Sequence, residues 1–256
     1  MISFTALKVV VLAAWAGVLA VAERMRPATA RPAASGRIAG NLALWLANTA
    51  MNPVLTAPIV LAATQIDAWA RPAAWSGPGA LVVDLLILDL WAYAWHRANH
   101  RWPLLWRFHE VHHRDAFLDV TTAVRFHPGE VLISALARAP LIVALDTPLM
   151  SVLFFDALLF AAALFHHSNL RLPPRTEATL RWFIATPSHH WVHHHARRSD
   201  TDSNYGVLLT AWDRLFASWS PTLRTPTMPI GVEGEPALPP AALAWRPFHR
   251  GSIRAA

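Results

Sequence analysis

Histidines recur in this sequence at the spacing of a single helical turn. Residues three or four apart share one face of an α-helix, so such a group can aim several imidazoles at one point. Imidazole binds iron, zinc, copper and nickel. We therefore predict a metal site built by three helical groups of histidines: His96 and His100; His109, His112 and His113; His190, His193 and His194.

The number of histidines predicts two metal ions close together. His127 in RFHPGE and His167 in FHHSNL join the grouped residues as candidate ligands. A zinc ion takes three or four protein ligands, so this many imidazoles exceeds what one ion needs. Neutral ligands also leave the positive charge on the metals, which suits oxygen activation on an apolar substrate.

One stretch also matches the H-E-x-x-H pattern of zinc peptidases, in His109, Glu110 and His113. Such an enzyme has no use for His112 or for the other histidine groups. We interpret the pattern as part of an H-x-x-H-H triple and keep a membrane zinc hydrolase as the alternative. A metal transporter or sensor is a third possibility, but the apolar segments offer few polar residues for a path across a bilayer.

Polar residues near the histidines are candidates for holding the rings in place. Asp89 and Tyr93 continue the helical stripe of His96 and His100, and a carboxylate in an apolar segment is usually functional. Asp89 can accept a ring N–H and fix the tautomer of a ligand. Glu130, which follows His127 by three, is a further candidate. Asp156 precedes His167 by 11 residues and either holds that ring or forms a polar contact between helices.

The remaining histidines are weaker candidates. His166 and His189 each precede a better candidate in the chain, and we interpret them as supporting or incidental. His195 points away from the face of the third group, and His249 lies in the tail, where we expect a surface residue.

The composition predicts an integral membrane protein. Hydrophobic residues make up 54% of the 256 residues and charged residues only 15%, against about a quarter in soluble domains. The absence of cysteine excludes disulfides, thiolate metal sites and a cysteine nucleophile. Lys and Arg outnumber Asp and Glu by 22 to 16, which we attribute to positive-inside topology and not to nucleic-acid binding.

Apolar segments long enough to cross a bilayer occur at 3–22, 39–65, 79–95 and 131–165. The first is expected to be an anchor and not a cleaved signal, because its arginines follow the apolar run. Asn48, Asn52 and Pro53 interrupt the second, which is one long span or a broken helix. The turn signal Asp146-Thr147-Pro148 divides the last into a hairpin of two helices.

With the N-terminus outside, every histidine group falls on the cytoplasmic side, where most arginines also gather. The expected fold is all-α: a membrane helical bundle with a cytoplasmic, histidine-rich helical cap. We expect a single membrane domain in three parts, with N-terminal transmembrane helices in 1–78, the core in 79–220 and a Pro-rich, extended cytoplasmic tail in 221–256.

From about Asp84 to Trp219 the sequence resembles the fatty acid hydroxylase and sterol desaturase superfamily of membrane di-iron enzymes. The resemblance lies in the blocks DLWAYAWHRANH, LWRFHEVHH, TTAVRFHPGE, FHHSNLRLP, TPSHHWVHHH and DSNYGVLLTAWDRLFASW. It implies a transmembrane bundle with a histidine-bearing cap and the following metal ligands: His96, His100, His109, His112, His113, His127, His167, His190, His193 and His194.

The resemblance also implies chemistry in which two iron ions use O2 to hydroxylate or desaturate a C–H bond of a lipid. The sequence has no Gly-rich dinucleotide motif, no haem signature and no cysteine for an iron–sulfur cluster. Electrons are therefore expected from a separate partner, a ferredoxin or a cytochrome b5-like protein with its reductase. The lipid is expected to enter from the bilayer, and no nucleic acid is expected as a partner.

Overall fold

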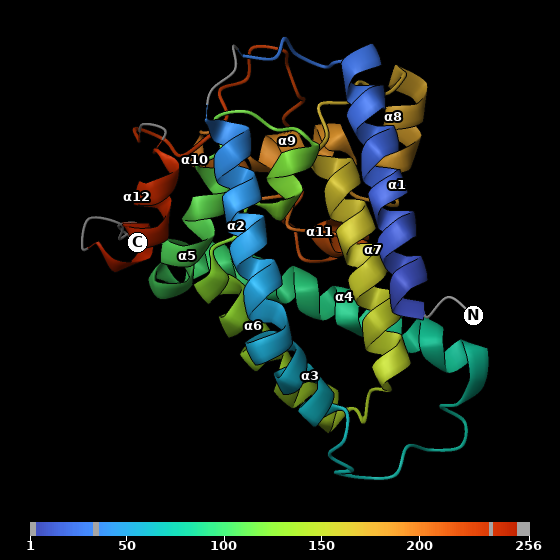
Figure 1. The fold of residues 1–256 in the computed structure, drawn as a ribbon. Coiled ribbons are helices and arrows are strands. Elements are labelled where there is room, and N and C mark those ends of the chain that lie inside the picture. Colours follow the sequence, from blue (N-terminus) through green and yellow to red (C-terminus); the bar gives the residue numbers. More distant parts are fainter. Residues whose placement is uncertain (1–3, 33–35, 236–237, 250–256) are drawn as a thin grey trace.

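The computed structural model describes residues 4–32, 36–235 and 238–249 and shows a bundle of helices (Figure 1). The described residues contain no β-strand, which confirms the all-α fold. The bundle is built from these long helices: α1 (Phe4–Met25), α2 (Arg37–Met51), α4 (Gly77–Arg101), α6 (Pro128–Ala144) and α7 (Leu149–His167).

Four helical stretches have the length and apolar composition to cross a membrane. They are 6–25, 37–63, 77–101 and 149–167. The first three agree with predicted segments, and the last corresponds to the second half of the predicted segment 131–165. Their outward side chains are apolar: Val10 is 63% exposed, Val18 58% and Val54 70%. Exposed aliphatic surface of this kind suits contact with lipid tails. The sidedness of the bundle stays a prediction.

The second apolar segment is a single long helix with one irregular turn. A π-helical turn at Asn52–Thr56 joins α2 to α3 (Ala57–Ala63). Pro53 has no N–H for the regular ladder, and wider turns of this type accommodate such an interruption. The Thr56 hydroxyl donates to the Asn52 side chain inside this turn. Of the two predicted arrangements, the long span is therefore observed.

The predicted hairpin at Asp146-Thr147-Pro148 is confirmed. Helix α6 ends at Ala144, and α7 begins at Leu149. Asp146 adopts a positive φ of 48°, a conformation that Asp tolerates better than most residues. With 17 residues, α6 is shorter than the four membrane-length stretches. Helix α6 forms the first arm of the hairpin, and α7 forms the second arm, which ends at His167.

The long helices pack in pairs that bring their histidine ends together. Helix α1 lies beside α7, α3 beside α6, and α4 crosses α7 (Figure 1). The crossing is filled by Leu88, Ala92 and Phe155, which are almost fully buried. The last turns of α4 and α7 thereby reach the same region as the short helices of the cap.

The cap consists of short helices and the connections between them. They are α5 (Pro103–His113), a 3₁₀ turn (Val120–Val124), α8 (Pro174–Leu180), α9 (Pro187–His193), α10 (Arg198–Thr201) and α11 (Ala211–Leu215).

The C-terminal tail contains α12 (Pro240–Trp245) and a 3₁₀ turn (Arg246–Phe248), so the prediction of an extended tail is wrong in this part. Leu243 of α12 is fully buried against Leu44 and Val111, which fixes the tail on α2 and α5. Apolar residues among the prolines supply this packing.

Candidate metal centre

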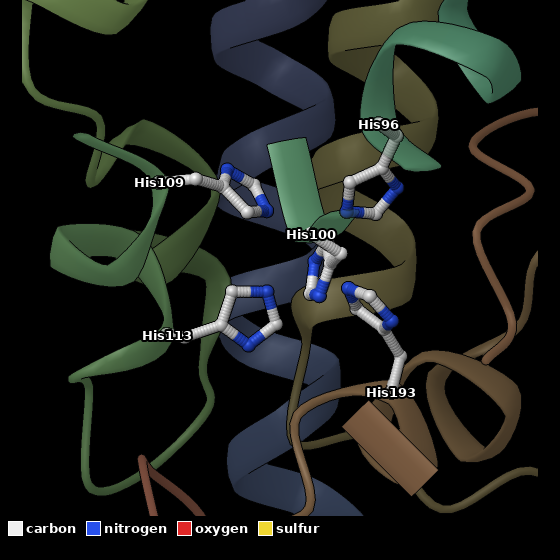
Figure 2. Close-up of side chains that lie close together, drawn as sticks. All are labelled: His96, His100, His109, His113 and His193. Carbon is white, nitrogen blue, oxygen red and sulfur yellow. The ribbon is translucent and has the colours of Figure 1, made fainter. Parts of the chain in front are cut away.

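Five histidines from three helices form the first group, which we call the five-histidine group. They are His96 and His100 of α4, His109 and His113 of α5, and His193 of α9. Figure 2 shows the five rings pointing toward one another from different sides. One ring nitrogen from each lies within 4.8 Å of the others, and none of the five residues is more than 8% exposed.

A sharp turn between α4 and α5 brings their histidines face to face. Trp102 separates the helices and has an extended backbone, with φ −96° and ψ 118°. Pro103 disfavours a helical conformation in the residue before it and is suited to the first turn of the next helix. The chain therefore reverses at this point, and α5 packs back on α4.

Three rings of the group are held through their Nδ1 atoms. His193 donates to Ser203 O at 2.7 Å and His96 to Tyr205 O at 2.9 Å. The Nδ1 atom of His109 lies 2.7 Å from a Glu130 carboxylate oxygen. Within the described part of the chain, Nε2 of His109 and of His193 has no hydrogen-bond partner. A bound metal is the group that such inward-facing, buried nitrogens fit.

A second set of histidines, the four-histidine group, lies directly beside the first. It consists of His112, His167, His190 and His194. The rings of His113 and His194 stack across the boundary between the groups with their centroids 4.3 Å apart. Two ions bound in the two groups would therefore be neighbours.

The four-histidine group brings ring nitrogens together in a way that suits a bound cation. His112 donates its Nδ1–H to Arg125 O, and His167 donates its own to Ala163 O. A neutral ring that carries its proton on Nδ1 has only a lone pair on Nε2. The two Nε2 atoms are nevertheless 3.0 Å apart, so two lone pairs face each other. A metal ion between them removes this repulsion.

Burial keeps the cap histidines neutral. Loss of solvent, with smaller contributions from neighbouring rings, lowers the pKa of the following residues well below the usual value: His112, His113, His190, His193 and His194. Neutral imidazole is the form that binds metal. The nine residues of the two groups therefore fit two metal ions.

Glu110 turns away from both groups. Its carboxylate accepts from Arg246 Nε at 2.8 Å and from Arg114 Nε at 3.3 Å. Burial raises its pKa, and the two guanidinium groups oppose that rise. A general base of a zinc hydrolase must reach the metal-bound water, whereas Glu110 is bound to arginines on the other side of α5.

His127 lies outside both groups, in contrast to its prediction as a ligand. Its Nδ1 accepts from Gly129 N at 2.9 Å at the start of α6. Its Nε2 therefore carries the proton and donates to Ala244 O at 3.1 Å. Both ring nitrogens are used, one as a helix cap and the other as an anchor for the tail.

The polar residues predicted to hold rings divide into two kinds. Glu130 contacts His109 directly. Asp89 instead accepts from Trp212 Nε1, and Tyr93 shares a hydrogen bond with Ser218. For these two, the expected direct contact with a histidine is replaced by contact with the segment after α10.

Asp156 forms an ion pair with Arg138 at 2.6 Å, across the α6–α7 hairpin. His167 donates to its own helix backbone at Ala163 O, so of the two predicted roles for Asp156 the contact between helices is the one observed. Asp156 is therefore a contact between helices and does not reach the metal groups.

The weaker histidine candidates belong to neither group. The ring of His166 packs 4.0 Å from that of His190, between centroids, and His189 contacts Asp213. His195 points away, as predicted, and bonds Asp200 at 2.7 Å. His249 is exposed, as predicted.

The sequence interpretation gave no role to two residues that the structure places beside the five-histidine group. Tyr205 is fully buried, and its ring centroid lies 5.2 Å from that of His100. Asp213 is fully buried and binds the backbone of the same segment. Both belong to the block DSNYGVLLTAWD, in which an acidic residue at the end of the apolar run VLLTAW was the available signal.

Comparison with known proteins places these residues in one family. The family model described as fatty acid hydroxylase matches residues 81–218, which is more than half of the chain and includes both histidine groups. No solved structure matches the chain.

Three relatives illustrate the similarity. Ornithine lipid hydroxylase OlsE of Rhizobium tropici is 31% identical over 77% of this chain and 59% of its own length. Alkylglycerol monooxygenase of Homo sapiens is 28% identical over 57% and 32%, and cholesterol 25-hydroxylase of Rattus norvegicus is 24% identical over 54% and 46%. The chain thus spans less than two thirds of the length of each relative, and all three are named as enzymes that add oxygen to lipids.

Proposed function

Since the chain belongs to the fatty acid hydroxylase family, we propose that it is a membrane di-iron oxygenase that hydroxylates a C–H bond of a lipid. One observation carries this proposal: two adjacent groups, with five and four buried histidines, point their ring nitrogens at two neighbouring centres. Neutral nitrogen ligands suit iron, and two ions side by side supply the electrons for oxygen chemistry better than one.

The two histidine groups would hold the irons, which would supply the redox chemistry for adding one oxygen atom of O2 to a C–H bond, with release of the other atom as water. This reaction consumes two electrons and two protons from outside. The histidines hold the metals, and burial of every ring keeps bulk water away from the reacting carbon. Glu130 and the carbonyls of Ser203 and Tyr205 fix which nitrogen of each partner ring faces inward.

The substrate class follows from the setting of the site. Two helices of membrane length, α4 and α7, carry His96, His100 and His167 near their ends, so a lipid can reach the groups from within the bilayer. The named relatives act on an ornithine lipid, alkylglycerols and cholesterol. All three add oxygen, which favours hydroxylation over desaturation for this chain.

A separate protein is proposed to supply the electrons, either a ferredoxin or a cytochrome b5-like protein with its reductase. Exposed arginines of the cap, among them Arg171, Arg175 and Arg197, give a basic surface that suits an acidic donor. In this proposal the cap and both histidine groups face the cytoplasm, where such donors are reduced.

A zinc hydrolase based on His109, Glu110 and His113 is the competing function. The ion pairs of Glu110 with Arg246 and Arg114 disfavour it, because they occupy the carboxylate away from both histidine groups. Glu110→Gln should therefore leave the metal content unchanged and reduce oxygenase activity less than any ligand variant.

The test is metal content of the protein purified in detergent from cells supplied with iron, with His193→Ala beside it. We expect about two irons per wild-type chain and a sharp fall in the variant. Membranes of expressing cells should contain a lipid that is heavier by one oxygen atom, which His193→Ala cells lack. A single zinc that survives His193→Ala, with activity that depends on Glu110, would overturn the proposal.

A further inference from the structure

The segment from Ser203 to Ser218, which we call the carbonyl segment, supplies the backbone acceptors for two rings of the five-histidine group. Ser203 O accepts from His193 of α9, and Tyr205 O accepts from His96 of α4. A carbonyl can only accept, so each contact fixes the ring proton on Nδ1 and leaves the Nε2 lone pair for a metal. The position of two carbonyls therefore decides the tautomer and the direction of two rings.

One carboxylate holds the backbone at this point. Asp213 is fully buried and accepts from Tyr205 N at 2.7 Å and from Gly206 N at 2.9 Å. It also accepts from the hydroxyl of Ser218 at 2.8 Å and contacts His189 Nε2 at 3.2 Å. Tyr205 O and Gly206 N–H belong to one peptide unit, which Asp213 therefore holds directly. The peptide unit that carries Ser203 O is held through Ser218, because Asn204 N donates to Ser218 O at 2.7 Å and Asp213 binds the hydroxyl of the same serine.

Glycine is required where the carboxylate meets the backbone. A Cβ atom on Gly206 would lie 2.7 Å from Asp213 Oδ2 and 2.7 Å from Leu209 O. Both distances are too short for a carbon atom beside these oxygens. The absence of a side chain at Gly206 therefore lets Asp213 reach two consecutive amides at once.

A second carboxylate binds the same segment from α4. Asp89 accepts from Leu209 N at 3.1 Å, from Leu208 N at 3.3 Å and from Trp212 Nε1 at 2.8 Å. It lies two turns before His96 on one face of α4. The helix that presents His96 thus also anchors the segment whose carbonyl orients His96.

The four-histidine group is oriented by different residues. The acceptors for His112 and His167 are Arg125 O and Ala163 O, and neither belongs to the carbonyl segment. A displacement of this segment should therefore affect the five-histidine group first.

We propose that Asp213 is a positioning residue of the metal centre, which acts through Tyr205 O and Ser203 O on His96 and His193. The inference rests on the proposed function, because it assumes that the five-histidine group binds a metal. Asp213 does not touch the metal in this arrangement. It holds the backbone so that two ligands present the correct nitrogen.

The test is Asp213→Asn, which keeps the shape of the side chain. The amides of Tyr205 and Gly206 and the hydroxyl of Ser218 all point donors at the carboxylate, whereas an amide side chain has only one acceptor oxygen. Its NH2 group must then face donors, and the carbonyl segment shifts. We expect metal affinity at one site to fall by about 10- to 100-fold, the range for loss of a group that orients a ligand.

The readout is titration of the metal-free protein with Fe(II) and with Co(II) against a competing chelator, together with the absorption spectrum of the cobalt form. We expect two tight sites in the wild type, and one tight and one weakened site with an altered spectrum in Asp213→Asn. Asp156→Asn is the matched control, because this carboxylate binds Arg138 away from the groups and should keep both sites.

A purely structural role predicts a different result. It would lower the thermal stability of the metal-free protein while both affinities of the folded fraction stay at the wild-type values, and that outcome overturns the inference. If Asp213→Asn does not fold, Asp89→Asn applies the same test from the other anchor, and two wild-type affinities in that variant would overturn the inference as well. A wild type that binds no metal would overturn the proposed function instead.

Discussion

At the residue scale, the two roles of histidine in this chain can be separated by single substitutions. His109→Ala removes a ring of the five-histidine group, and we expect its metal content to fall. His127→Ala removes a helix cap and a bond to Ala244 O, so we expect the full metal content and a stability loss of about 1 kcal/mol. Metal analysis and thermal unfolding of both variants check this. Loss of metal in His127→Ala to the level of His109→Ala would assign it as a ligand.

The contrast between His109 and His127 also shows which members of the histidine groups could be predicted from the sequence. Helical spacing was sufficient for the grouped histidines, because rings at i, i+3 and i+4 share a face wherever the helix lies. The contacts of His127 and Asp156 could not be predicted from spacing, because each has a partner on another element, Ala244 O for one and Arg138 for the other. Spacing within one segment contains no information about such contacts.

At the element scale, the C-terminal tail stabilises α5, the helix that carries three of the nine grouped histidines. Arg246 follows α12 and binds Glu110 in the middle of α5, with its side chain 15% exposed. Arg246→Ala leaves this buried carboxylate paired with Arg114 at the end of α5 and should lower stability by roughly 1–3 kcal/mol. The metal content at low temperature should be retained. The thermal unfolding midpoint relative to that of Arg175→Ala, an exposed arginine on α8, measures the effect.

A midpoint that is equal in the two arginine variants would contradict a structural role for this tail contact.

The tail also shows where the prediction of secondary structure from sequence fails. The prolines of the tail predicted an extended chain. Leu243 is instead fully buried against Leu44 and Val111, and this packing stabilises a short helix. The membrane helices were predictable because a long apolar run has few alternatives to a helix in a bilayer.

At the scale of the whole molecule, nine imidazoles are buried in a helical bundle. The free energy of unfolding should therefore depend on pH and on metal binding. The cap histidines have lowered pKa values in the folded protein, so they stay neutral there as the pH falls. In the unfolded chain the same rings titrate near the ordinary value of about 6.5. The unfolded state therefore binds more protons below that pH, and the free energy of unfolding must decrease as the pH falls.

We therefore expect the metal-free protein to be most stable above about pH 6.5 and to lose stability progressively below it. The free energy of unfolding should change by about 1.4 kcal/mol per pH unit for each ring that is protonated only on unfolding.

Metal binding should raise stability at neutral pH, because only the folded chain presents both histidine groups. This gain should shrink in acid, where protons compete with the metal for the ring nitrogens. Denaturant unfolding at about pH 7.5 and pH 5.5, with and without iron, measures both effects. His193→Ala should show a shallower pH slope than the wild type, since it has one buried ring fewer, and a slope of zero in the wild type would show that the rings are already charged in the fold.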